Sequence, residues 1–267
     1  MTTTAEFTAT ALFAETREFG VELEFKTTKS AAQIAAALTE AGIPTLWEGY
    51  NHITRAYWKI VSDASVPGGW ELVSPPLPFT DASFGQIETV SRVLIGLGCT
   101  VDRQCGLHVH HFANDLTANQ IGKVLALYVK HESWFDGMLP ASRRGTSNRF
   151  CRTLNIRGDV ASSVESFAAV RTRQDLDNLL GSRYFKVNHQ SLYRHGTLEF
   201  RHHSGTIEAA KIVNWVKITR AMLQAGATSR SVVMRGAPNA WQFFRAICGK
   251  ALTAYIRART AQLATAA

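Results

Sequence analysis

The segment Phe19-Gly20-Val21-Glu22-Leu23-Glu24-Phe25 alternates large apolar side chains with two carboxylates. Successive side chains of a β-strand point to opposite faces, so Glu22 and Glu24 share one face, and the Phe, Val and Leu side chains share the other. The pattern therefore predicts a strand that packs one face against a core and presents two carboxylates on the other. A solvated antiparallel strand gives the same pattern, so the segment alone does not assign a function.

Three later segments repeat this alternation. GLHVHHF places His108 and His110 on one face, TLEFRHH places Glu199 and Arg201 together, and WELVSPP carries Glu71 as its single acid. Each motif alone is compatible with exposed histidines or with a surface ion pair. Together, on one concave sheet, the carboxylates would repel one another unless cations neutralised them. Oxygen-rich ligand sets with one or two imidazoles suit Mg²⁺ or Mn²⁺ better than Zn²⁺, so we expect a divalent metal site.

Composition is that of a globular protein. The 267 residues are 46% hydrophobic, enough to bury a substantial core, and no linker or tandem repeat divides them, so one domain over residues 1–267 is expected. The four cysteines include no CxxC pair, which favours reduced thiols. The first ten residues lack a leader pattern and no stretch is long and apolar enough to span a membrane, so a soluble, cytoplasmic protein is predicted.

The net charge of +8 favours an anionic partner such as a nucleotide, a nucleic acid or an acidic substrate. Arginines concentrate only in SRRGTSNRFCR, residues 142–152, which we call the arginine-rich segment. No basic tail and no run of interleaved aromatic and basic residues accompanies it, so the charge does not require a nucleic acid.

Periodicity and turn residues predict an α+β domain with a largely antiparallel sheet covered on one face by helices. Residues 55–66 and 69–77 form a predicted hairpin across Pro67-Gly68-Gly69, and Asp81 is the predicted cap of the helix at residues 81–98. The other predicted strands cover residues 106–112, 184–187 and 197–203. Predicted helices cover residues 29–42, 81–98, 117–139, part of 160–181, 207–225 and 239–262.

The motifs resemble the amidoligases of the carboxylate-amine ligase superfamily, relatives of glutamine synthetase and glutamate-cysteine ligase. The likeness rests on GVELEF, WKIVSDASV with GWELVSPPL, CGLHVHHF, SRRGTSNRFC and GTLEFRHHSGT, in this order across roughly residues 17 to 220. It implies a glutamine-synthetase-like fold, an antiparallel sheet curved into a funnel. It further implies an ATP- and Mg²⁺- or Mn²⁺-dependent ligase that joins a small-molecule or peptide carboxylate to an amine through an acyl phosphate.

Site residues follow from the same resemblance. The acids and the first histidine would hold metal ions, and the arginines and the second histidine would contact ATP. In the SDAS loop Asp63 would bind the amine, although Ala64 stands where the family has glycine. The implied catalytic residues are Arg201, Asp63 and Glu199; the implied metal ligands are Glu22, Glu24, Glu71, His108 and Glu199; and the implied ATP contacts are Arg143, Arg144, Arg149, His110 and Arg201.

Two other classes remain open from the residues. A metal-dependent hydrolase would use His108, His110 and a carboxylate to activate water, although HExxH is absent. A nucleic-acid-binding protein would use the arginine-rich segment and would show steeply salt-dependent affinity.

Overall fold

The computed structural model describes residues 17–63, 66–229 and 239–265. The first ten residues, for which no leader was predicted, and Ala64 of the SDAS loop lie outside these described residues. The chain forms two compact units: unit 1 is Met1–His111 with His203–Val216, and unit 2 is Phe112–His202 with Lys217–Ala267. The single domain expected from the sequence stays a prediction.

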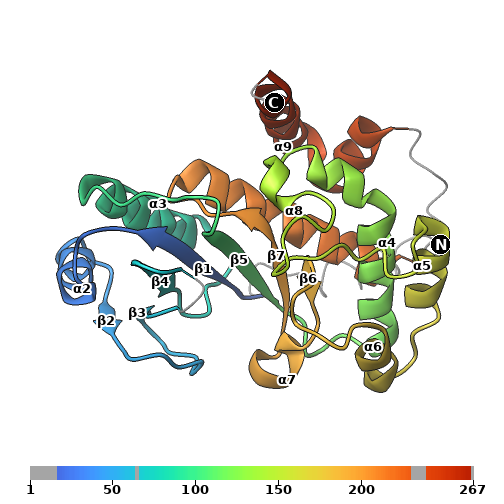
Figure 1. The fold of residues 1–267 in the computed structure, drawn as a ribbon, viewed down its shortest axis with the longest axis horizontal. Coiled ribbons are helices and arrows are strands. Elements are labelled where there is room, and N and C mark those ends of the chain that lie inside the picture. The colour runs from blue at the N-terminus through green and yellow to red at the C-terminus, as the bar shows by residue number, and fades with distance from the viewer. Residues whose placement is uncertain (1–16, 64–65, 230–238, 266–267) are drawn as a thin grey trace, which may run out of the picture. The chain divides into compact units, whose positions relative to one another are not determined.

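Unit 1 is built on a sheet whose strands follow the order β2-β3-β4-β1-β5 (Figure 1). All neighbours in it are antiparallel except β2 and β3, which are parallel. The predicted hairpin is confirmed as the antiparallel pair β3 and β4. The short strand β2 was not predicted. The strands are β1 (Phe19–Lys26), β2 (Thr45–Trp47), β3 (Trp58–Val61), β4 (Gly69–Val73) and β5 (Gly106–Phe112).

The apolar face of β1 forms part of the core of unit 1. Phe19, Val21, Leu23 and Phe25 are all buried, and Phe84 stacks on Phe19 with ring centroids 5.9 Å apart. Phe84 comes from helix α3 (Asp81–Gly96). Burial of each such side chain stabilises the fold by about 2 kcal/mol. The predicted packing face of this strand is thus present.

Both helices at the start of unit 1 begin at side-chain caps. In α2 (Ala31–Glu40) Ser30 accepts a hydrogen bond from the backbone of Gln33, whose side chain caps Ser30 in return. The prediction that Asp81 caps α3 was wrong: the Thr80 hydroxyl accepts from the backbone of Ser83. A threonine in extended conformation supplies the same capping oxygen one residue earlier, and Asp81 then lies in the first turn, where a negative charge is favoured.

Unit 2 is mostly helical, with strands β6 (Val187–Asn188) and β7 (Thr197–Ser204) paired antiparallel. Helix α8 (Ala209–Thr228) begins in unit 1 and ends in unit 2. The predicted last helix is confirmed as α9 (Ala240–Thr265), but Gly249, with φ of 75°, breaks its helical geometry. The remaining elements are α4 (Ala118–Asp136), a 3-10 turn (Ala141–Arg143), α5 (Val160–Ala168), α6 (Arg173–Leu179) and α7 (Ser191–His195).

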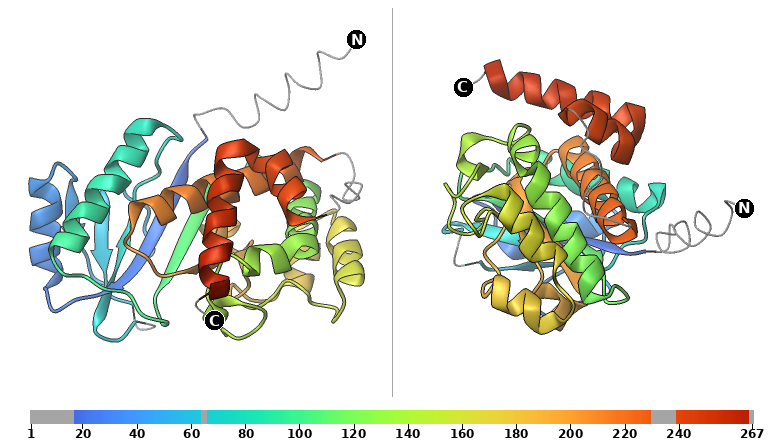
Figure 2. Two further views of the ribbon diagram at one scale, coloured as in Figure 1. Left: turned by 90° about the horizontal axis from the view of Figure 1, so that it is seen from above. Right: turned by 90° about the vertical axis from the view of Figure 1, so that its right-hand side faces the viewer.

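Helices α4 and α5 lie side by side in unit 2 (Figure 2). Their close approach requires a glycine: a Cβ at Gly122 would lie 2.4 Å from the carbonyl oxygen of Phe167 and 2.7 Å from Cβ of Val170. The described helices of both units include none with the length and apolar character to cross a lipid bilayer. The mixed α and β class and the mostly antiparallel pairing are confirmed, whereas the likeness to the glutamine synthetase fold stays a prediction.

Candidate functional site

Strand register gathers the carboxylates of unit 1 on one sheet face. Glu22 of β1 lies opposite His108 of β5, and Glu24 lies opposite Glu71 of β4. Directly opposite residues of an antiparallel pair point to the same face. The alternation along β5 adds His110 to this face. Three neighbouring strands therefore bring five of the predicted side chains together.

His108 lies between the two carboxylates of β1. Its Nδ1 is 3.0 Å from Oε2 of Glu22, and its Nε2 is 3.7 Å from Oε1 of Glu24. The second histidine, His110, places Nε2 at 3.3 Å from Oε1 of Glu22. The backbone N–H of Gly106 donates to Oε2 of Glu24 over 2.6 Å. Glu24 is only 4% exposed, so this donor replaces water that burial removes.

The environment keeps Glu22 ionised. Burial by itself raises the pKa of this carboxyl, but the charge of His110 and hydrogen bonds from His108 and His110 outweigh it and hold the pKa well below its ordinary value. The side chain of Glu22 is still 23% exposed, so the charge is reachable from solvent. An ionised carboxylate is the form that accepts a hydrogen bond from a histidine or binds a cation.

The chemistry of the donors fits a divalent cation. Glu24, Glu71 and His108 each offer one ligand atom, and these atoms lie within 4.8 Å of one another. Two carboxylate oxygens and one imidazole nitrogen suit Mg²⁺ or Mn²⁺. The missing side chain of Gly106 preserves space at this point, since a Cβ there would lie 2.8 Å from Nε2 of His108 and 3.4 Å from Oε2 of Glu24. These residues can therefore hold a metal ion.

Lys59 is a charged residue on this face that sequence reasoning missed. Lys59 lies two residues before Val61 on β3, so the two side chains point to the same face of the sheet. Val61 lies opposite Glu71, so the Lys59 side chain leaves β3 on the carboxylate face. Its ammonium donates to Oδ1 of Asn51 over 2.8 Å and to the carbonyl of Ile53 over 2.7 Å. Burial lowers the pKa of this lysine, while the nearby glutamates oppose the shift. The alternation of WKIV could have indicated its orientation.

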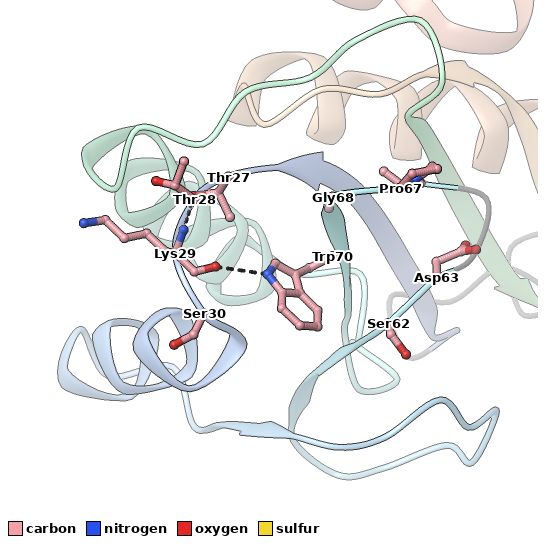
Figure 3. A pocket seen from close by; sticks show the side chains of 11 residues that line it. Thr27, Thr28, Lys29, Ser30, Ser62, Asp63, Pro67, Gly68 and Trp70 are labelled. Atoms are coloured by element: carbon pink, nitrogen blue, oxygen red, sulfur yellow. Dashed lines mark hydrogen bonds between the residues drawn. The ribbon is translucent and has the colours of Figure 1, made fainter.

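Asp63 lines a cavity of about 530 Å³ in unit 1 (Figure 3). Across the cavity lie Lys29 and Trp70, and the indole N–H of Trp70 donates to the carbonyl of Lys29 over 3.1 Å. Trp70 precedes Glu71 in β4, so the two side chains leave the strand on opposite faces. The predicted role of Asp63 at the amine stays a prediction.

In unit 2, Glu199 and Arg201 form an ion pair on β7. The carboxylate of Glu199 also accepts from Nδ2 of Asn188 over 2.6 Å, and Nε of Arg201 donates to the carbonyl of Phe150 over 3.3 Å. Asn188 is the cross-strand partner of Glu199. Its role in holding this carboxylate was not predicted, because the pairing of β6 with β7 cannot be read from either segment alone.

The three predicted ATP-binding arginines differ in accessibility. Arg143 is only 3% exposed and donates to Sγ of Cys151 at 3.9 Å. Arg144 is partly exposed and donates to the carbonyl of Leu139 over 2.9 Å. Arg149 is exposed, with its guanidinium 4.7 Å from the ring centroid of Phe150. Arg149 is thus the best placed of the three to meet a soluble anion.

These features define a mixed α and β protein with a candidate divalent-metal site on the face of a largely antiparallel sheet. Residues 15–223 match the model of a family described as "Putative amidoligase enzyme", and the chain belongs to this family. The match confirms the resemblance seen in the sequence motifs. A search of curated proteins found no match.

Proposed function

We propose that this protein is an ATP- and Mg²⁺-dependent carboxylate-amine ligase. Membership of the amidoligase family supports a ligase. The dependence on Mg²⁺ and ATP is supported by one observation: the ligand atoms of Glu24, Glu71 and His108 lie close enough together to hold one cation. A cation at this position would neutralise negative charge on ATP during phosphoryl transfer.

The reaction needs two steps. An oxygen of the substrate carboxylate attacks the γ-phosphorus of ATP, the bond to the β-phosphate oxygen breaks, and ADP leaves. The amine nitrogen then attacks the acyl carbon of the acyl phosphate, inorganic phosphate leaves, and the nitrogen loses a proton. We propose that Arg201 and Arg149 stabilise the phosphate oxygens, and that Asp63 takes the proton from the amine. Glu199 is proposed to bind a further metal ion, and Glu22 to fix the ring of His108 through the hydrogen bond described above.

ADP release tests the proposal. The protein is incubated with Mg²⁺, ATP and a panel of carboxylates paired with amines, and the amide is identified by mass spectrometry. We expect ADP release that requires both substrates and falls by about 10²-fold or more in Glu24→Gln and Glu199→Gln proteins. The control is Glu40→Gln, an exposed carboxylate at the end of α2. Undiminished activity in Glu24→Gln protein contradicts the metal assignment.

Binding of Mn²⁺ provides a test that needs no substrate. Wild-type protein should bind Mn²⁺, and Glu24→Gln and His108→Asn proteins should bind it at least about ten-fold more weakly in calorimetric titrations. Metal-dependent hydrolysis of a substrate in the absence of any nucleotide would instead favour the hydrolase interpretation.

A further inference from the structure

Lys186 is completely buried in unit 2. Lysine is rarely buried to this degree unless its charge is paired. Here the ammonium lies 2.8 Å from Oε1 of Glu132 and 2.6 Å from Oδ1 of Asp136, two carboxylates on neighbouring turns of α4. Neither the metal site nor the proposed reaction uses this lysine, so its charge calls for another explanation.

The same two carboxylates hold the arginine-rich segment. Oδ2 of Asp136 accepts from the backbone N–H of Gly145 over 3.1 Å, within the segment. Oε2 of Glu132 accepts from the backbone N–H of Leu154 over 2.8 Å, just beyond it. Asp136 therefore joins Lys186 to the backbone of the segment, and Glu132 joins Lys186 to the backbone two residues beyond the segment. Removal of the ammonium would leave both carboxylates without the positive charge that offsets the cost of burying them.

His202 adds a third connection. The hydroxyl oxygen of Tyr128 lies 2.6 Å from its Nδ1, and both partners of its Nε2 are acceptors, so Nε2 carries a proton. Nε2 lies 2.7 Å from Oδ1 of Asp136 and 3.0 Å from the carbonyl oxygen of Arg143. The neighbour of Arg201 on β7 is thus hydrogen-bonded both to the carboxylate that pairs with Lys186 and to the arginine-rich segment.

The backbone of Lys186 lies between the segment and β7. Its N–H donates to the carbonyl of Arg152 over 2.9 Å, and its own carbonyl accepts from the N–H of Arg201 over 2.9 Å. Main chain and side chain of this one residue therefore join the arginine-rich segment, helix α4 and the strand of Arg201.

We propose that Lys186 is a positioning residue that fixes the arginine-rich segment relative to Arg201, so that the guanidinium groups of Arg149 and Arg201 can meet the same phosphate chain. This inference rests on the proposed function, because it takes a nucleotide as the ligand of these arginines. The side chain of Lys186 has no exposed surface, so it would act through the segment and not by contact with a nucleotide.

The test uses the full-length protein and two variants. Lys186→Met removes the charge and keeps most of the side-chain volume. Since a lone buried carboxylate can prevent folding, Lys186→Met with Glu132→Gln removes one charge of each sign. The readouts are the Kd for Mg²⁺ with the ATP analogue AMP-PNP, the Kd for Mn²⁺ alone, and amide hydrogen exchange in residues 142–152. The control is Ile121→Ala, a buried residue at the other end of α4.

We expect faster exchange in residues 142–152 and an AMP-PNP affinity about ten-fold or more weaker in both variants. The affinity for Mn²⁺ alone should stay within about two-fold of the wild-type value. A general loss of stability would weaken both affinities, not the AMP-PNP affinity alone. Ile121→Ala should change neither affinity. Unchanged exchange, or unchanged AMP-PNP affinity in a double variant that folds, overturns the role proposed for Lys186 and leaves the proposed function standing. Absence of AMP-PNP binding by the wild-type protein overturns the proposed function, and the nucleotide role of Lys186 with it.

Discussion

Gly106 controls the space beside His108 in the candidate metal site. A Cβ at this position would lie 2.8 Å from Nε2 of His108, too close for any real contact, so the ring must shift away from residue 106 and from its present place. We expect Gly106→Ala to weaken Mn²⁺ binding by about ten-fold or more, as changes around metal ligands commonly do. Isothermal titration calorimetry with Mn²⁺ measures the effect.

The control for this substitution lies on the adjacent strand. A Cβ at Gly20 would meet Oγ of Ser74 at 3.5 Å and Cβ of His110 at 3.8 Å, which are ordinary van der Waals contacts. Gly20→Ala should therefore leave Mn²⁺ affinity nearly unchanged. Equal affinity of the Gly106→Ala and wild-type proteins would place the metal somewhere other than at Nε2 of His108.

Single side chains show what the sequence could and could not predict about the site. Alternation alone predicted that Glu22 and Glu24 share a face, and likewise His108 and His110. It could not predict the register that sets Glu24 opposite Glu71, because strand pairing depends on contacts between distant segments. The buried charge of Lys186 was also missed, because lysine is normally a surface residue and its partners lie about fifty positions away.

Helices and strands with a clear local sequence pattern were predicted well, whereas short elements that depend on distant contacts were not. Long periodic helices such as α4 were predicted with nearly correct ends, since Thr117 provides a capping box. Strand β2 has three residues and α7 has five, too few for a periodic signal. The predicted strand at residues 184–187 begins later, at Val187, because Phe185 forms only an isolated bridge with Arg152.

The contact of α9 with α4 should depend on pH through His131. Its ring stacks on Trp134 at 4.5 Å and lies 3.9 Å from the ring of Phe243 in α9. Burial, assisted by the charge of Lys130, lowers the pKa of His131 to about 4. The folded protein therefore disfavours the protonated ring. The stability associated with the neutral ring is complete above the ordinary pKa of about 6.5 and is lost as the pH falls toward about 4.

Between pH 7 and pH 5 this one group should lower the free energy of unfolding by about 2 kcal/mol. His131→Phe keeps an aromatic ring and removes the titration. The decrease in the free energy of unfolding between pH 7 and pH 5 should therefore be smaller by about 2 kcal/mol in this variant than in the wild-type protein. Urea unfolding followed by tryptophan fluorescence measures it. His52→Phe, at an exposed histidine, should keep the wild-type pH dependence. A pH dependence that is the same in His131→Phe and wild-type proteins would contradict the assignment.

Considered as a whole, the molecule uses part of its positive charge internally. The sequence contains 29 basic and 21 acidic residues, which gives the net charge of +8. Several of these basic side chains are buried and cannot reach a phosphodiester backbone: Arg17, Lys59, Arg143, Lys186 and Arg220. Lys59 and Lys186 are committed to hydrogen bonds inside their own units. The net charge therefore overstates the positive surface available to a large polyanion.

Salt dependence distinguishes a nucleotide-binding protein from a nucleic-acid-binding protein. A protein that contacts six to ten phosphates of duplex DNA loses about 10³- to 10⁵-fold in affinity between 50 and 200 mM salt. With part of its charge buried, this protein should bind a duplex with a Kd of about 10 μM or weaker near physiological salt, measured by fluorescence anisotropy. Tight and steeply salt-dependent DNA binding that survives Glu24→Gln would favour the nucleic-acid-binding interpretation, because that carboxylate belongs to the candidate metal site and would not attract a phosphate backbone.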